Sequence, residues 1–274
     1  TTVSMACEAA KRALEDAGTD AGEVDLIIVS TISSNVILPC AACEVQKLIG
    51  AEHATCYDMS AACSGFVLAY NAAQAYIAAG MYRTVLIIGS ESLSNLTNWK
   101  DRGTCILFGD GAGAAVIKAF EERFYLPVTH SEGAKGEALT CLSRHAQADA
   151  ARMTDAEYFM QMDGHAVFKF AVKRVPEVIG EVLEKNKVKR SDVAWYCMHQ
   201  ANRRIVESVA KRLDEPIEKF PMNLQEYGNT SSASIGILLD EMNRAGQLEK
   251  GQKIVLAGFG AGLTWGACIA EWMK

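Results

Sequence analysis

Hydrophobic residues in the first half of the chain alternate between helical spacing and short unbroken runs. Apolar positions 5, 9, 13 and 17 recur at helical spacing and the segment stops at Gly18, which predicts a helix over residues 3–17. The apolar run over residues 24–32 predicts a buried strand. The remaining elements expected in this half are a helix over 63–80, a strand over 84–90 and a strand pair turning on glycines within 105–120. This alternation is typical of a mostly parallel sheet covered by helices.

The second half repeats this order of elements. A helix over residues 165–186, with a kink or restart at Pro176, precedes a strand over 192–199, and alignment of the two halves places His199 opposite Ser30. Residues 230–246 correspond to the helix that begins at Cys63. Two copies, each longer than a hundred residues, exclude a solenoid and favour a pair of duplicated α/β halves. We expect the halves to be residues 1–122 and 123–274, with an inserted polar segment over 132–157.

Composition narrows the class of protein. The chain has 274 residues, half of them hydrophobic, which is enough for a large core. It contains no apolar run long enough to span a bilayer and no recognisable signal peptide, so we expect a soluble, cytoplasmic protein. A net charge of −6 argues against binding to nucleic acid, because phosphate neutralisation requires a surplus of Lys and Arg.

Cysteine usage points to a reducing compartment and away from a metal site. Nine cysteines, an odd number, lie scattered in mostly apolar segments, which suits free thiols better than a disulfide framework. Cys40 and Cys43 form one CxxC motif, but no second pair stands at a zinc-site spacing. We therefore predict no metal and a packing role for this motif.

Three residues with useful chemistry fall at equivalent strand ends and helix starts of the two halves, where ligands of open α/β sheets bind. Cys63 begins a helix, whose positive end would favour the thiolate; His199 ends a strand; Asn229 precedes the matching helix. A cysteine with a histidine can form and break a thioester, and an asparagine is a fixed hydrogen-bond donor. Taken singly, each has a structural alternative: a packed thiol, a core histidine and a helix cap.

Five segments together resemble the β-ketoacyl-acyl-carrier-protein synthase III family, the condensing enzymes that start bacterial fatty-acid synthesis. They are "DMSAACSGFVLAY", "DRGTCILFGDGAGAAVI", "MHQANRRI", "NLQEYGNTSSASI" and "FGAGLTWGA", in the family's order and spread over essentially the whole chain. The resemblance implies a thiolase-like five-layer αβαβα sandwich of two duplicated halves, in agreement with the repeat.

The resemblance also implies roles for the catalytic residues. Cys63 would take an acyl group from acyl-CoA, and His199 and Asn229 would bind the thioester oxygen of malonyl-acyl carrier protein while it loses carbon dioxide. The backbone N–H groups of Cys63 and Ala261 would form the oxyanion hole of the acyl-transfer step. No cofactor is implied, since acyl-CoA and malonyl-acyl carrier protein are substrates.

Further residues resemble the family's binding surfaces. Arg102 matches the residue that packs on the CoA adenine, Asn202 the one that positions the pantetheine arm, and Leu38 the one that reaches into the acyl pocket of a dimer partner. Four basic residues could form a landing site for the acidic carrier protein, with an ordinary solvated surface as the alternative. They are Lys169, Arg204, Lys211 and Arg212.

The resemblance fails at the start of the sequence. The family normally has an opening strand, a hairpin and an adenine-contacting aromatic before the segment "TTVSMACEAA", and these are missing here. The open alternatives are a related condensing enzyme of secondary metabolism and an inactive subunit that binds carrier protein. Retention of Cys63 argues against the inactive subunit.

Overall fold

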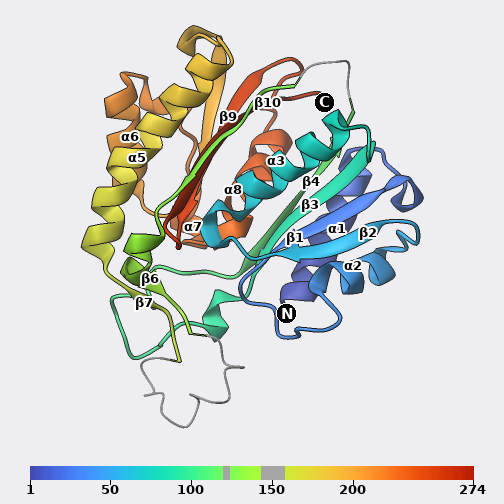
Figure 1. Ribbon diagram of the computed structural model, residues 1–274, viewed down its shortest axis with the longest axis horizontal. Helices are drawn as coiled ribbons and strands as arrows, with labels where there is room; N and C mark the ends of the chain where they lie inside the picture. Colours follow the sequence, from blue (N-terminus) through green and yellow to red (C-terminus); the bar gives the residue numbers. More distant parts are fainter. Residues whose placement is uncertain (120–123, 143–157) are drawn as a thin grey trace.

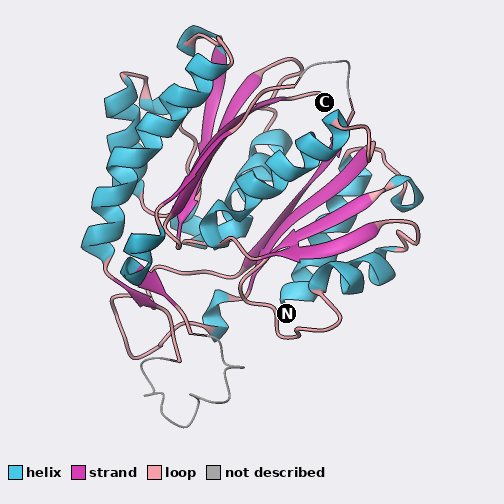
Figure 2. Ribbon diagram, viewed as in Figure 1, coloured by secondary structure: helices cyan, strands magenta, loops and turns pink. Residues whose placement is uncertain are grey.

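The computed structural model describes residues 1–119, 124–142 and 158–274. Two four-stranded sheets stand face to face with helices between and outside them (Figure 1). Figure 2 shows the resulting order of layers as helix, sheet, helix, sheet, helix. The predicted five-layer sandwich of two duplicated halves is therefore confirmed.

The first sheet has the strand order β2–β1–β3–β4. Its strands are β1 (Leu26–Ser30), β2 (Thr55–Met59), β3 (Thr84–Glu91) and β4 (Gly111–Lys118). β1 runs parallel to β2 and β3, and β4 runs antiparallel to β3. Every residue of β1 and β3 is buried, as expected for strands that have helices on both faces.

The second sheet has the order β5–β10–β9–β8 and repeats this pattern. Its strands are β5 (Val128–Ser131), β8 (Val193–Met198), β9 (Lys253–Gly260) and β10 (Thr264–Glu271). β8 and β9 are parallel, and β10 is antiparallel to β9. β8, β9 and β10 thus correspond to β1, β3 and β4, so that His199, directly after β8, is the counterpart of Ser30 at the end of β1.

Alternating side chains of each strand point to different layers. In β1, Ile27 and Val29 face the outer helices α1 (Thr2–Asp16) and α2 (Ala41–Ile49). Leu26 and Ile28 face the central layer, which consists of α3 (Gly65–Ala78) and α8 (Ser234–Arg244). The central helices are therefore enclosed by both sheets, and their first residues meet at the centre of the molecule.

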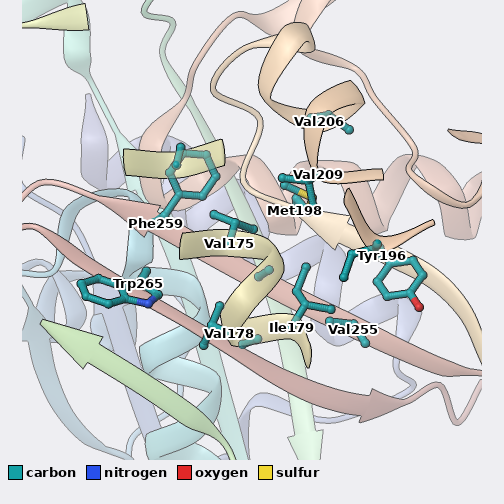
Figure 3. Close-up of a cluster of buried hydrophobic side chains, with 14 of the residues drawn as sticks. Val175, Val178, Ile179, Tyr196, Met198, Val206, Val209, Val255, Phe259 and Trp265 are labelled. Atoms are coloured by element: carbon teal, nitrogen blue, oxygen red, sulfur yellow. The ribbon is translucent and has the colours of Figure 1, made fainter. Parts of the chain in front are cut away.

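The outer layer of the second half consists of α5 (Gly164–Lys185) and α6 (Arg203–Leu213). Figure 3 shows Val175, Val178 and Ile179 of α5 packed among strand residues that include Tyr196 and Val255. α5 runs through Pro176 as one helix, so of the predicted kink or restart the restart does not occur. Burial of apolar side chains on both sides of the proline offsets the hydrogen bond that proline cannot make.

Two other expectations need correction. Residues 105–110 do not form a strand beside β4; Phe108 makes a single β-bridge to Asn229 instead. In α1 the fully buried side chains are not the predicted stripe at 5, 9, 13 and 17 but mainly Ala6, Cys7, Ala10 and Leu14. The predicted apolar stripe lines a groove of about 1420 Å³ along the outer edge of β4. The corresponding edge of β10 is paired with β5.

Short elements complete the described chain. Of the predicted insertion over residues 132–157, residues 132–142 are described. The expected boundary between the halves, at 122/123, lies outside the described residues. The division into domains therefore stays a prediction. The short elements are η1 (Ala21–Glu23), η2 (Ala62–Ser64), η3 (Leu93–Asn95), η4 (Gly133–Ala138), η5 (Arg190–Asp192), η6 (Ile217–Lys219), η7 (Ser231–Ala233), α7 (Leu224–Tyr227), β6 (Leu139–Thr140) and β7 (Gln161–Met162). No helix of the described ranges is long and apolar enough to cross a membrane.

Candidate active site

Cys63 lies in the turn η2, immediately before the central helix α3, and its side chain is buried. The preceding residue, Ala62, has a φ of +45°, a left-handed conformation that turns the chain sharply before the helix. Gly260, at the end of β9, lies against the thiol: a Cβ at this position would be 2.7 Å from the Cβ of Cys63. A larger residue at 260 would displace the nucleophile.

The resting cysteine is a thiol. Burial raises the pKa of Cys63 to about 12, and the hydrogen bond to Ser231 only partly opposes this rise. Desolvation of the sulfur therefore acts against the thiolate that the helix start is expected to favour. The proton must leave as the sulfur attacks.

His199 follows β8 and is buried beneath the start of α8. Its Nδ1 lies 2.7 Å from Ser234 Oγ, and its ring makes an edge-to-face contact with Phe259, with centroids 5.2 Å apart. Burial lowers the pKa of His199 to about 3, although a backbone hydrogen bond to Ser231 acts in the opposite direction. The imidazole is therefore neutral at physiological pH.

Asn229 is held by its own backbone and by the residue two positions later. Its backbone N–H donates to Leu107 O at 2.8 Å, and its carbonyl accepts from Gly109 N at 3.0 Å. The side-chain oxygen accepts from Ser231 N at 2.8 Å. Because the oxygen is engaged, the amide group Nδ2 is the part of the side chain that remains to donate to a ligand.

Ser231 joins the three predicted residues and was missed by sequence analysis. Cys63 Sγ donates to Ser231 Oγ at 3.4 Å, the Ser231 N–H orients Asn229, and the Ser231 carbonyl oxygen lies 2.9 Å from Ser234 Oγ. Ser231 has a φ of +49° and is the counterpart of Ala62 in the other half. The hydroxyl-rich run "TSSAS" before a helix was the only signal for it.

A small cavity lies beside the thiol. It has a volume of about 50 Å³, and Cys63, Ser231 and Ala261 contribute to its wall. The rest of the lining is mostly apolar: Ile32, Ala62, Leu93, Phe108, Leu139, Thr140, Cys141 and Met160. An acyl group on the sulfur would find apolar surroundings here.

Glu91 is a second residue missed by sequence analysis, at the end of the apolar strand β3. It is fully buried, and its carboxylate accepts from Ser33 Oγ at 2.5 Å, from Ile32 N at 3.1 Å and from Ser232 Oγ at 2.9 Å. Burial raises its pKa and these hydrogen bonds oppose the rise. Because Ser33 and Ser232 belong to different halves, Glu91 ties the halves together next to the site.

The buried, neutral His199 predicts an acid-sensitive fold. The unfolded chain takes up a proton at this histidine below about pH 6.5, whereas the folded chain does so only near pH 3. We expect the free energy of unfolding to fall by up to about 1.4 kcal/mol for each pH unit below 6.5 from this residue alone. Urea unfolding at pH 7.5 and 5.5 measures this loss. His199→Gln should reduce it and His53→Gln, at an exposed position, should not; equal pH dependence in all three proteins would contradict the prediction.

Two of the predicted binding residues, Arg102 and Asn202, are exposed or partly exposed. Arg102 is exposed on the loop after η3. The indole of Trp99 in the same loop is also exposed, and its Nε1 donates to Ser94 O. Asn202 caps α6, where its side chain accepts from Arg204 N at 2.9 Å. The structure thus gives Asn202 a structural role, and its predicted contact with pantetheine stays a prediction.

The four basic residues are all exposed. Lys169 lies on α5, and Arg204 at the start of α6 lies over the ring of Phe168, 5.3 Å from its centroid. Lys211 and Arg212 occupy the last turn of α6. In the described ranges none of the four makes an ion pair, whereas the neighbouring Arg203 is paired with Glu207 at 2.8 Å.

The loop before α2 carries an exposed apolar tip. Val36, Ile37 and Leu38 are 38%, 61% and 84% exposed. Leu38 does not line the cavity beside Cys63 of its own chain. Adjacent exposed apolar side chains of this kind are typical of protein contacts.

The CxxC motif opens α2, with Cys40 as the N-cap and Cys40 Sγ 3.4 Å from Cys43 Sγ. None of the nine cysteines, all of which lie in the described ranges, forms a disulfide. Within the described part of the chain no group of three or more His, Cys, Asp or Glu side chains could hold a metal ion.

Comparison with known proteins gives a consistent family. The family models for 3-oxoacyl-[acyl-carrier-protein] synthase III and for its C-terminal domain match residues 57–133 and 183–272. The β-ketoacyl-[acyl-carrier-protein] synthase III of Clostridium botulinum (strain 657 / Type Ba4) is 46% identical over 274 residues, which cover 99% of this chain and 84% of the relative. The enzyme of that name from Clostridium acetobutylicum is 43% identical over 277 residues, 100% of this chain and 85% of the relative.

Comparison with solved structures indicates the same family. The crystal structure of 3-oxoacyl-[acyl-carrier-protein] synthase III from Aquifex aeolicus VF5 superposes with a TM-score of 0.92 at 40% identity, covering 99% of this chain and 85% of that one. This chain belongs to the β-ketoacyl-acyl-carrier-protein synthase III family of condensing enzymes with the thiolase fold.

Proposed function

We propose that Cys63, His199 and Asn229 carry out the reaction of this family. The protein is an acyltransferase that condenses an acyl-CoA primer with malonyl-acyl carrier protein, releases carbon dioxide and so initiates type II fatty-acid biosynthesis. The product is a 3-oxoacyl-acyl carrier protein. The assignment of each step to a residue rests on the geometry of the site, and the steps use no cofactor and no metal.

Cys63 is the nucleophile of the first half-reaction. Its sulfur attacks the thioester carbonyl of acyl-CoA, the thiol proton leaves with the CoA sulfur, and the acyl group stays on Cys63. The negative oxygen that forms during attack would be held by the backbone N–H groups of Cys63 and Ala261, since both residues border the same cavity. Alanine at 261 supplies this amide as well as glycine would.

His199 and Asn229 serve the second half-reaction. As malonyl loses carbon dioxide, charge develops on its thioester oxygen, and an imidazole N–H together with the Asn229 amide would stabilise it. The carbanion then attacks the acyl carbon, and the Cys63 sulfur leaves and regains a proton from solvent. The neutral state of His199 fits a donor that does not give its proton away.

The observation that carries this proposal is the continuous hydrogen-bonded connection of the three residues through one turn. Ser231 contacts Cys63 from the first half and Asn229 from the second, and through Ser234 it reaches His199. A nucleophile, a neutral imidazole and an amide donor that are linked through Ser231 and Ser234 form the minimum set for acyl transfer followed by decarboxylation.

The complete reaction tests the proposal. The chain is incubated with acetyl-CoA and malonyl-acyl carrier protein, and 3-oxoacyl-carrier protein and released carbon dioxide are measured together. Equal amounts of both products are expected. Carrier-protein binding without either product would favour the inactive subunit. The named relatives at 43–46% identity do not favour that alternative or the secondary-metabolism enzyme.

We propose that the four exposed basic residues dock the carrier protein. Exposed, unpaired cations provide long-range attraction to an acidic partner, mainly through the association rate. Arg204→Glu is therefore expected to raise KM for malonyl-acyl carrier protein about tenfold, with acyl transfer from acetyl-CoA unchanged. The matched control is Arg203→Glu, at a cation already paired with Glu207. Unchanged carrier-protein kinetics in Arg204→Glu would remove it from the docking surface.

The remaining assignments concern CoA, assembly and location. Arg102 would lie over the adenine and Asn202 beside the pantetheine arm. The apolar tip at Val36–Leu38 supports a homodimer in which Leu38 reaches the partner's acyl pocket. Nine cysteines without a disulfide suit a reducing compartment, and we place the enzyme in the cytoplasm.

A further inference from the structure

The hydroxyl of Ser234 has one proton and two acceptors within reach. Ser234 Oγ lies 2.7 Å from His199 Nδ1 and 2.9 Å from the Ser231 carbonyl, and the Gln200 N–H approaches it at 3.4 Å. Ser234 and His199 are both buried, so water does not compete for these positions. The direction of the Ser234 hydroxyl therefore decides which nitrogen of the neighbouring imidazole carries the proton.

The proposed function requires one of the two tautomers. A neutral imidazole has a single N–H group, and it can stabilise a developing thioester oxyanion only if that group is Nε2–H. Nδ1 must then accept a hydrogen bond. Among the described residues, the Ser234 hydroxyl is the side-chain donor that contacts Nδ1.

We propose that Ser234 is a positioning residue that selects the Nε2–H tautomer of His199 by donating its hydroxyl proton to Nδ1. This inference rests on the proposed role of His199 as an oxyanion donor. If the hydroxyl instead donated to the Ser231 carbonyl, Nδ1 would have to carry the ring proton. Nε2 would then present a lone pair to the thioester oxygen and repel it.

The duplicated fold explains why this contact is fixed. Gly65 and Ser234 are the first residues of α3 and α8, and each lies against the residue that follows or ends the corresponding strand. In the first half, a Cβ on Gly65 would be 1.8 Å from Ser30 Oγ, and that buried hydroxyl has no hydrogen-bond partner among the described residues. In the second half the corresponding positions hold Ser234 and His199, whose Oγ and Nδ1 are hydrogen-bonded to each other.

The test compares the two half-reactions in Ser234→Ala. Acyl adduct formation from acetyl-CoA should stay within about twofold of wild type, whereas malonyl decarboxylation should fall about 10- to 100-fold, as for other residues that orient a functional histidine. Ser234→Thr retains the hydroxyl and should recover most of the loss. Ser90→Ala removes another buried hydroxyl, one that donates to Thr2 O, and should leave both half-reactions unchanged.

Nitrogen NMR of protein with labelled histidine gives a readout that a structural role would not change. Wild type should show the Nε2–H form of His199, and Ser234→Ala should lose this preference. An Nδ1–H form in wild type, or full decarboxylation activity in Ser234→Ala, would overturn the inference. His199→Ala separates the two proposals. If His199→Ala and Ser234→Ala both keep decarboxylation, the proposed function fails. If His199→Ala loses decarboxylation and Ser234→Ala keeps it, only the role of Ser234 fails.

Discussion

Cys63→Ala is expected to abolish the acyl adduct that wild type forms with acetyl-CoA, and with it the complete condensation. Among the described residues, two cysteines line the cavity that Ser231 and Ala261 also line: Cys63, which is buried, and Cys141, which is exposed. Intact-mass measurement after incubation with acetyl-CoA should show an increase of one acetyl group in wild type and none in the variant.

The cysteine variant has a matched control. Cys56→Ala removes a half-buried thiol of β2 that donates to the Ala54 carbonyl and does not line the cavity, and it should form the adduct normally. Loss of the small sulfur atom from Cys63 should leave the fold intact, which the urea midpoint checks. An adduct of unchanged yield in Cys63→Ala would show that another group takes the acyl chain. Loss of the adduct in both Cys63→Ala and Cys56→Ala would show that the assay responds to the stability of the protein and not to the nucleophile.

His199→Ala and Asn229→Ala are each expected to lower malonyl decarboxylation about 10²- to 10³-fold, the usual effect of removing one donor from an oxyanion site. Both should retain acylation of Cys63, because neither side chain acts in that step. Asn229→Asp should be at least as damaging: it keeps the shape and the acceptor for Ser231 N–H but replaces the donating amide with a charged oxygen.

Separate measurement of the half-reactions makes this prediction specific. Acylation is followed by intact mass and decarboxylation by release of carbon dioxide from malonyl-acyl carrier protein. Gln225→Ala, on the exposed short helix α7, serves as the control for Asn229. If His199→Ala and Asn229→Ala lose both half-reactions equally while remaining folded, the division of roles between the cysteine and the two donors is wrong.

Sequence patterns predicted much of the fold because buried strands appear as unbroken apolar runs and the duplication appears as a repeated order of elements. The unbroken apolar runs of β1 and β3 indicated strands with helices on both faces, and the repeat of helix starts and strand ends paired His199 with Ser30. The errors arose where tertiary packing overrides a local rule. Packing of Val175 and Val178 carries α5 through Pro176, and the buried face of α1 is set by the sheet it meets, not by its most regular apolar stripe.

The sequence by itself determined the family, the two-half architecture and the three residues proposed for chemistry, because these depend on residue types at fixed spacing. Only the tertiary structure decided how the residues are connected and charged. Ser231, Ser234 and Glu91 emerged there because their hydrogen bonds join residues far apart in the chain; Cys63 and Ser231, for example, are 168 positions apart. The neutral thiol and neutral imidazole also belong to the tertiary structure, since the burial that shifts their pKa values has no local signature in the chain.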